Sequence, residues 1–337
     1  MEDLTQRQID ILKVIIKEYT ETGLAVGSEI LEKKYKFNKC YNFYNIMLKL
    51  GAHQSIAGGY SEALKRINNI NGNCLQIFSS SPRGWNFAKI NDAEIKQFLI
   101  LNSKFSISPI YFHATYLINL ADDGRIGHAS KQSLISEMNL APKLGIKGSI
   151  IHLGSFKEKK QLPIENYLID DRPQDNKYKV LIANIREILD KTPKESLFII
   201  ENAGNRKIGQ TLEEISQIVK DVNNPRVKVC FDTCHLFSNG YKFDTNQELD
   251  IFLAKLAKLK INNIVELWHV NDSRDEFDSG HDRHDNIGQG EIGIEEFKVL
   301  LNHQQTKNFP FIIETPGFDG NGPDKKNLDI LKSLVNK

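Results

Sequence analysis

The chain has almost no net charge and no long apolar run. Its 44 lysines and arginines face 43 aspartates and glutamates, a formal charge of +1 at pH 7, so no global basic field predicts a polyanionic partner. No stretch approaches the roughly 18 apolar residues of a membrane span, and the N-terminus lacks a signal-like apolar segment with a cleavage site. We therefore expect a protein without a membrane anchor that stays inside the cell, in cytoplasm or nucleus, or in a viral particle.

Cysteine is too scarce for a disulfide scaffold. The four cysteines, Cys40, Cys74, Cys230 and Cys234, are scattered along the chain. Cys230 and Cys234 are close enough in sequence to suggest a metal site, but two thiols within an apolar stretch are typical core residues. We expect them to be reduced and structural.

The sequence does contain a regular alternation of apolar runs and longer amphipathic segments. Eight apolar or β-branched runs occur at residues 46–53, 74–80, 107–114, 147–154, 196–203, 227–235, 263–272 and 309–316. Repeated βα units indicate the α/β class with a parallel sheet, and eight of them predict a closed (β/α)8 TIM barrel over residues 47–337.

The segments between these runs carry signals for helix ends. In residues 211–222, apolar residues recur at helical spacing, and Thr211 with Glu214 predicts a capping box. Pro193, Pro225 and Pro310 stand just ahead of the fifth, sixth and eighth runs, where a helix has to stop.

Residues 1–46 predict a short helical extension. Its signals are a capping pair, Thr5 and Gln8, an apolar helical stripe and a stop at Gly23. The segment TQRQIDILKVIIKEYTETGLAVGSEILEKKY at 5–35 resembles the opening helices of the winged-helix domain of HrcA-type heat-inducible repressors. The following residues enter the first barrel strand, so a complete winged helix does not fit. The alternative is a helical cap packed on the barrel.

Side chains of metal-binding type stand at or just past the ends of the apolar runs. These nine residues are His113, His152, Glu201, Asp232, His235, His269, Asp282, His284 and Glu314. Because carboxyl ends of barrel strands meet at one face, we expect these side chains to converge. Three or four protein ligands per zinc make nine too many for one ion and suitable for three. Taken singly, the rival explanations are a buried salt bridge for Glu201 and a capping turn for Asp232.

Several motifs extend this pattern to a family resemblance. They are GAHQSIAGG at 51–59, HATYLINLA at 113–121, IIHLGS at 150–155, IENAG at 200–204, FDTCHLFSNGY at 231–241, the segment from HVND to GEIG at 269–293, and IIETP at 312–316. Through them, residues 50–337 resemble endonuclease IV, the zinc-dependent apurinic/apyrimidinic endonuclease family 2.

The resemblance implies three Zn²⁺ ions per chain. One would be bound by His113, His152 and Glu201, a second by Glu201, Asp232, His269 and Glu314, and a third by His235, Asp282 and His284. It also implies a catalytic role for Glu201 and Glu314. The chain departs from the family at Leu153, where proline is usual, at Phe156, where a second histidine is frequent, and at Ala114, where aspartate is frequent. These departures concern rate and metal affinity rather than the type of reaction.

The implied substrate is duplex DNA containing abasic sites or blocked 3′ ends, with the chain acting as a monomer. Cleavage would fall 5′ to the abasic sugar and leave a 3′-hydroxyl and a 5′-deoxyribose phosphate, with zinc lowering the pKa of the attacking water. Arg83, Trp85 and Tyr116 match DNA contacts of the family, although Gly84 replaces a frequent glutamine. The alternative for Arg83 and Trp85 is an exposed turn that packs on itself.

Two other functions fit parts of the pattern. A sugar isomerase or epimerase of the xylose-isomerase-like barrels also places Glu, Asp and His at strand ends, but its one or two metals leave His235, Asp282 and His284 without a role. A DNA-binding regulator with an inactive barrel would use residues 1–46 instead, and the complete ligand set argues against it.

Overall fold

The computed structural model describes residues 13–17, 20–21, 48–85, 90–156, 171–204 and 207–336, with residues 171–175 as helix backbone alone. The chain divides into two compact units, Met1–Met47 and Leu48–Lys337. In the first unit, residues 13–17 and 20–21 are helical, as expected for the extension. The rest of the HrcA-like segment, including Gly23 and the pair Thr5 and Gln8, lies outside the described residues.

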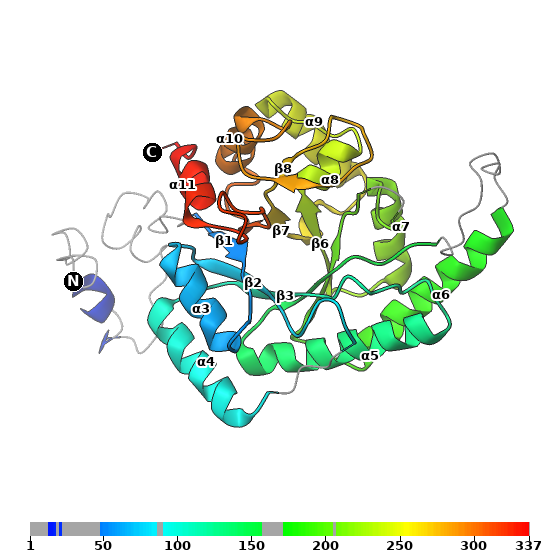
Figure 1. Cartoon of the computed structure of the whole chain (residues 1–337), viewed down its shortest axis with the longest axis horizontal. Coiled ribbons are helices and arrows are strands. Elements are labelled where there is room, and N and C mark those ends of the chain that lie inside the picture. Colours follow the sequence, from blue (N-terminus) through cyan, green and yellow to red (C-terminus); the bar gives the residue numbers. More distant parts are fainter. Residues whose placement is uncertain are drawn as a thin grey trace. The chain divides into compact units, whose positions relative to one another are not determined.

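Eight parallel strands of the second unit close into a barrel, which confirms the predicted (β/α)8 fold (Figure 1). The strands are β1 Leu50–His53, β2 Cys74–Phe78, β3 Ile110–His113, β4 Gly148–Ile151, β5 Leu197–Glu201, β6 Val227–Asp232, β7 Val265–His269 and β10 Phe311–Ile313. Each strand pairs with its neighbours in chain order, and β10 closes the barrel on β1 through the register Leu50 to Phe311. A separate antiparallel pair, β8 Asp272–Ser273 and β9 His284–Asp285, follows β7.

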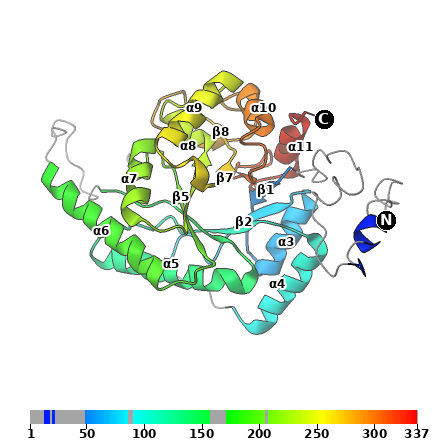
Figure 2. The same cartoon turned by 180° about the vertical axis from the view of Figure 1, so that it is seen from behind.

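Helices surround the barrel in both views (Figures 1 and 2). They are α3 Tyr60–Asn69, α4 Asp92–Phe105, α5 Arg125–Leu140, α6 Asp171–Asp190, α7 Leu212–Val222, α8 Thr233–Ser238, α9 Asn246–Lys258, α10 Ile294–Asn302 and α11 Lys325–Ser333, with short 3-10 turns at Ala141–Leu144 and Asn262–Ile264. Among the described residues, none of these helices is long and apolar enough to cross a membrane.

All eight predicted runs extend beyond the strands that form, and local structure explains two of the differences. The sixth run, predicted to 235, ends as a strand at Asp232, whose Oδ1 accepts the backbone N–H of His235 at 3.0 Å and starts α8. The seventh run begins with the 3-10 turn Asn262–Ile264, so β7 starts only at Val265. Asp232 therefore does cap a helix, as the alternative for this residue proposed, while its second oxygen, Oδ2, accepts a hydrogen bond from Asn271 Nδ2 at 2.6 Å.

The predicted capping box of α7 is only half right. Thr211 accepts the N–H of Glu214 as expected, but the Glu214 carboxylate accepts the backbone N–H groups of Gly209 and Gln210, at 2.8 and 3.2 Å, instead of that of Thr211. A complete capping box forms at α9 between Thr245 and Glu248. Pro193, Pro225 and Pro310 precede β5, β6 and β10 as predicted.

Alternation along the strands separates the barrel interior from the shell of helices. Side chains of one phase, such as Phe198 and Ile200 on β5, pack outward with those of the helices. The opposite phase fills the interior with one apolar cluster: Cys74, Tyr111, Ile150, Ile199, Cys230, Leu267 and Ile312. Because strand side chains repeat every two residues, the next interior position toward the C-terminal end is fixed for each strand.

Candidate metal centre

On seven of the barrel strands, the interior position two residues beyond the apolar cluster carries a polar side chain. Two residues beyond the seven members of the apolar cluster lie Gln76, His113, His152, Glu201, Asp232, His269 and Glu314. Most of them are fully buried, and six were predicted as ligands from the sequence. The apolar layer below them removes water from the barrel, so these groups must satisfy one another or bind an ion.

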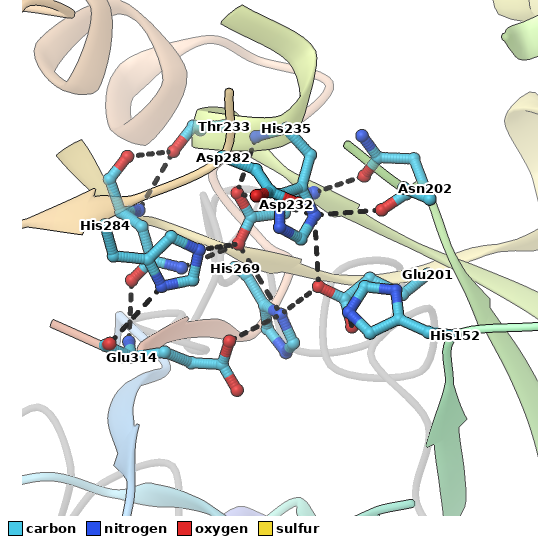
Figure 3. Close-up of polar contacts among 12 residues, drawn as sticks. His152, Glu201, Asn202, Asp232, Thr233, His235, His269, Asp282, His284 and Glu314 are labelled. Carbon is cyan, nitrogen blue, oxygen red and sulfur yellow. Dashed lines mark hydrogen bonds and ion pairs between the residues drawn. The ribbon is translucent and has the colours of Figure 1, made fainter. Parts of the chain in front are cut away.

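Glu201 is the carboxylate that most of the predicted histidine ligands contact, among them His152, His235 and His269 (Figure 3). Its Oε2 is 3.0 Å from His113 Nε2 and 3.2 Å from His152 Nε2, whereas its Oε1 is 3.1 Å from His269 Nδ1. His269 Nδ1 also lies 3.8 Å from Asp232 Oδ2 and 3.7 Å from Glu314 Oε2. Two sets of ligand atoms, each within 4.8 Å of one another, result: His113, His152 and Glu201, and Glu201, Asp232, His269 and Glu314.

These two sets coincide with the first two predicted zinc sets, and one carboxylate is common to both. The donors are imidazole nitrogens and carboxylate oxygens, which suit zinc at three or four ligands per ion. Glu201 and Asp232 are fully buried, where an ionised carboxylate is costly unless a cation offsets its charge. The residues present therefore fit a pair of neighbouring metal ions.

The third predicted set is less compact. His235, Asp282 and His284 line one cavity of about 360 Å³ together with His152 and Glu314. Asp282 Oδ2, however, lies 3.6 Å from Lys207 Nζ, and the ligand-type group found among the described residues here is Asp232, Cys234 and His284. Burial raises the pKa of the Cys234 thiol, so the neutral form persists without metal. The third zinc set remains a prediction.

Burial and mutual contacts set the protonation of the centre. Burial raises the pKa of Glu201, but His152, His269 and His113 outweigh it and hold that pKa well below its usual range. Burial lowers the pKa of His152 to about 3, which leaves the imidazole neutral and able to act as a ligand. For His269, burial acts downward, but the contacts with Cys230, Glu314 and Glu201 raise its pKa well above the usual value. Without metal, His269 thus carries the positive charge that the carboxylates require.

Amides hold the carboxylates in place, and these residues were not predicted. Asn271 Nδ2 donates to Asp232 Oδ2 at 2.6 Å, and Asn271 Oδ1 accepts the N–H of Glu314 at 2.7 Å. Asn202 Oδ1 accepts the backbone N–H of Asp232 at 2.6 Å, and the backbone oxygen of Asn202 lies 2.9 Å from His235 Nδ1. A buried asparagine just after a strand that ends in a ligand is the signal that would have found both.

Gln76 and His53 also contact the ligands and were missed. Gln76 Oε1 lies 2.7 Å from His269 Nε2, and Gln76 Nε2 donates to Glu314 Oε1. His53 Nδ1 is 3.3 Å from the same oxygen of Glu314. Both residues occupy interior positions of β1 and β2, so strand phase, rather than ligand type at a strand end, would have identified them.

The predicted DNA contacts lie on loops at the same end of the barrel. Tyr116 is 68% exposed, and its ring meets Phe78 edge-on at 5.4 Å. Arg83 is exposed, and its loop is tied to that of Tyr116 by Thr115 Oγ1, which donates to Pro82 O at 2.6 Å. Trp85, by contrast, is half-buried and packs against the apolar cluster beneath. In this loop Arg83 is therefore exposed to solvent, whereas Trp85 anchors the loop by packing on apolar side chains.

A groove continues from the metal cavity past Trp85. A hollow of about 670 Å³ shares His152 and Lys207 with the metal cavity and reaches Trp85 and Ile126. A further hollow of about 560 Å³ shares Trp85 and Ile126 and adds Arg125 and His128. An extended ligand could run from the carboxylates along the β3–α5 loop.

Comparison with known proteins agrees with this architecture. The model of the xylose isomerase-like TIM barrel family matches residues 64–334. A protein named "Probable endonuclease 4" from Sulfurihydrogenibium sp. is 31% identical over 293 residues, covering 86% of this chain and all of that protein. One of the same name from Thermosipho melanesiensis is 35% identical over 277 residues, covering 80% of this chain and 93% of its own length.

Solved structures point the same way. The crystal structure of endonuclease IV from Thermus thermophilus superimposes with a TM-score of 0.70 at 28% identity, covering 85% of this chain and 98% of that one. A 3-keto-D-glucoside 4-epimerase from E. coli aligns with a TM-score of 0.58 but only 13% identity, a likeness of fold alone. The chain belongs to the endonuclease IV family of xylose isomerase-like TIM barrels.

Proposed function

We propose that this protein is a zinc-dependent DNA repair endonuclease. It hydrolyses the phosphodiester 5′ to abasic sites in duplex DNA, leaving a 3′-hydroxyl and a 5′-deoxyribose phosphate. The observation that carries the proposal is the pair of ligand sets joined through Glu201. Two metal ions that share a carboxylate are suited to an in-line displacement at phosphorus, because both the entering and the leaving oxygen need stabilisation.

Three zinc ions would be held by the nine predicted ligands, which extend the two compact sets with His235, Asp282 and His284. When bound, the zinc ions would supply Lewis acidity and lower the pKa of water. Asn202, Asn271 and Gln76 hold the carboxylates and His269 in fixed orientations. Such outer hydrogen bonds set ligand basicity and keep the site ready for substrate.

Recognition of DNA rests on the rim of the cavity. Arg83 and Tyr116 project from the loops after β2 and β3 and are available to contact the duplex beside the lesion, with Trp85 packed below. A nucleotide that has lost its base costs less to turn out of the duplex than an intact one. Because Gly84 has no side chain to fill the gap left in the stack, Arg83 and Tyr116 carry this role.

The same centre accounts for a second substrate group. A phosphate or sugar fragment on a 3′ end presents the same phosphodiester or phosphomonoester to the metals without the need to open a continuous strand. We therefore include 3′-phosphatase and 3′-phosphodiesterase activity in the proposal. The protein is expected to act as a monomer, because every proposed ligand comes from one chain.

A duplex with a single tetrahydrofuran abasic analogue tests the proposal. The zinc-loaded protein should incise it 5′ to the analogue, a strong chelator should abolish incision, and added zinc should restore it. Metal analysis of the same preparation should give three zinc ions per chain. The absence of 5′ incision by protein that contains zinc would refute the proposal.

Sugar isomerisation is the alternative that shares this fold. His235, Asp282 and His284 line the cavity, yet that reaction, with one or two metals, gives them no role. One manganese or magnesium ion per chain, with no zinc, would favour the isomerase instead.

A further inference from the structure

His53 lies inside the metal cavity but belongs to neither compact ligand set. Its side chain is 14% exposed, and its ring stands 4.3 Å from that of Phe78. The Nε2 atom is buried and has no hydrogen-bond partner among the described residues. A buried imidazole nitrogen without a partner is costly unless something else in the cavity satisfies it.

Neighbouring hydrogen bonds decide which His53 nitrogen carries the proton. His269 directs Nδ1 at Glu201, Asp232 and Glu314, so as a ligand it binds through Nδ1 and keeps its proton on Nε2. That Nε2–H lies 2.7 Å from Gln76 Oε1, which accepts it. The orientation of the Gln76 amide follows, since its oxygen is already committed to His269.

The Gln76 amide nitrogen then determines the state of His53. Gln76 Nε2 donates to Glu314 Oε1 and lies 2.8 Å from His53 Nδ1. His53 Nδ1 also lies 3.3 Å from Glu314 Oε1, but its contact with the Gln76 amide is the shorter one. Because an amide NH₂ group only donates, His53 Nδ1 accepts from it, and the proton of a neutral His53 resides on Nε2. The relay from His269 through Gln76 thus leaves a buried N–H donor, on a residue that lines the metal cavity, that no described residue accepts.

We propose that His53 donates this Nε2–H to a non-bridging oxygen of the phosphate that is cleaved. The inference rests on the proposed function, which brings a phosphodiester into the cavity. The phosphate gains negative charge density as the reaction proceeds, and a donor held in a fixed position stabilises that charge. His53 is then a substrate-binding residue, distinct from the residues that hold metal.

Two substitutions distinguish the role of His53 Nδ1 as an acceptor from that of His53 Nε2 as a donor. In His53→Asn, the amide oxygen can still accept from Gln76, near the former Nδ1, but no donor reaches the position of Nε2. In His53→Gln, the longer side chain can return an N–H donor to that position. We expect His53→Asn to lower kcat on the order of 100-fold, His53→Gln to recover most of it, and both variants to keep the zinc content of the wild type.

A spectroscopic readout tests the same inference without turnover. In ¹H–¹⁵N spectra of the zinc-loaded protein, the resonance that His53→Asn removes should belong to an Nε2-protonated imidazole. It should move downfield when the incised duplex with its 5′-deoxyribose phosphate is added. An Nδ1-protonated ring, an unmoved resonance, wild-type kcat in His53→Asn or loss of zinc from that variant would each overturn the inference. Failure of the wild type to incise would instead refute the proposed function, and leave the protonation of His53 unchanged.

Discussion

Lys207 is a single side chain at the point where the metal cavity meets the groove. It lines both hollows, is 44% exposed, and has its Nζ 3.6 Å from Asp282 Oδ2. Burial raises the pKa of Asp282, but Lys207, His235 and His284 outweigh it and lower that pKa. If zinc takes the Asp282 carboxylate, the ammonium of Lys207 faces the groove and can meet a DNA phosphate.

The Lys207→Ala variant should therefore bind abasic duplex DNA more weakly. Each lysine that neutralises a phosphate releases counterions, so the slope of log affinity against log salt should fall by about one. Fluorescence anisotropy at several salt concentrations measures this slope. Lys298→Ala on α10 is the matched control, because Lys298 is 47% exposed and also pairs with a carboxylate, that of Glu295. Equal slopes for both variants would contradict a contact between Lys207 and DNA.

Glu296 is a buried carboxyl group that should make the stability of the protein depend on pH. It is buried in the first turn of α10, with Oε2 accepting the N–H of Phe243 at 3.2 Å and Oε1 without a partner among the described residues. Burial raises the pKa of Glu296 to about 8 from 4.5. Between about pH 4.5 and pH 8, the folded state therefore keeps a proton on Glu296 that the unfolded chain releases. The free energy of unfolding consequently falls as pH rises through this range.

Replacing Glu296 with glutamine removes this loss. The free energy of unfolding of Glu296→Gln should approach or exceed that of the wild type as pH rises, by up to a few kcal/mol at about 1.4 kcal/mol per pKa unit. Urea denaturation of zinc-saturated protein at pH 5, 7 and 8.5 measures the difference. Glu295→Gln, an exposed neighbour, should show little change with pH. A difference between Glu296→Gln and wild type that is constant with pH would contradict the explanation.

At the level of secondary structure, the phase of the strands explains which parts of the fold and site could be predicted from the sequence. The apolar runs located all eight strands, and ligand types at their ends identified six of the seven polar interior positions. Gln76 was missed because glutamine is an uncommon ligand, and His53 because the family resemblance assigns no metal to it. Contacts between loops, such as that between Lys207 and Asp282, depend on loop paths that residue spacing does not determine.

Gly204 links the end of β5 to the loop between β8 and β9. A Cβ at residue 204 would lie 2.6 Å from both Cβ and Cγ of Asp282, so Asp282 can occupy its position only because residue 204 has no side chain. Gly204→Ala should push Asp282 out of the cavity and disturb the proposed third zinc set, while the two sets around Glu201 remain. The expected result is a fall from three zinc ions to two after gel filtration, with a folded barrel by circular dichroism.

A control distinguishes this from a general effect of alanine. Gly124 has an ordinary φ of −92°, and a Cβ there would meet its nearest described neighbour, Asp122 Oδ1, at a normal 3.4 Å. Gly124→Ala should therefore bind as much zinc as the wild type. If Gly204→Ala also retained three zinc ions, Asp282 would not be a ligand in the way proposed.

At the scale of the whole molecule, affinity for DNA has to be local. The chain as a whole carries only +1, but three zinc ions would bring six positive charges to four ligand carboxylates, Glu201, Asp232, Asp282 and Glu314. The loaded centre would be cationic in a protein that is nearly neutral, so metal binding and DNA binding are coupled. Removing the metals should weaken DNA binding as well as stop cleavage.

The division of the chain gives the last prediction. The unit Leu48–Lys337 contains the closed barrel and all nine proposed ligands, and family matching begins at residue 64. Deleting residues 1–46 should therefore leave 5′ incision of the tetrahydrofuran duplex within a few-fold of the full chain, because no proposed ligand or DNA contact is removed. Circular dichroism and zinc content establish that the shortened protein is folded and loaded. Complete loss of incision by such a protein would mean that the first unit takes part in the reaction, as a DNA-binding segment resembling the HrcA-type repressors could do.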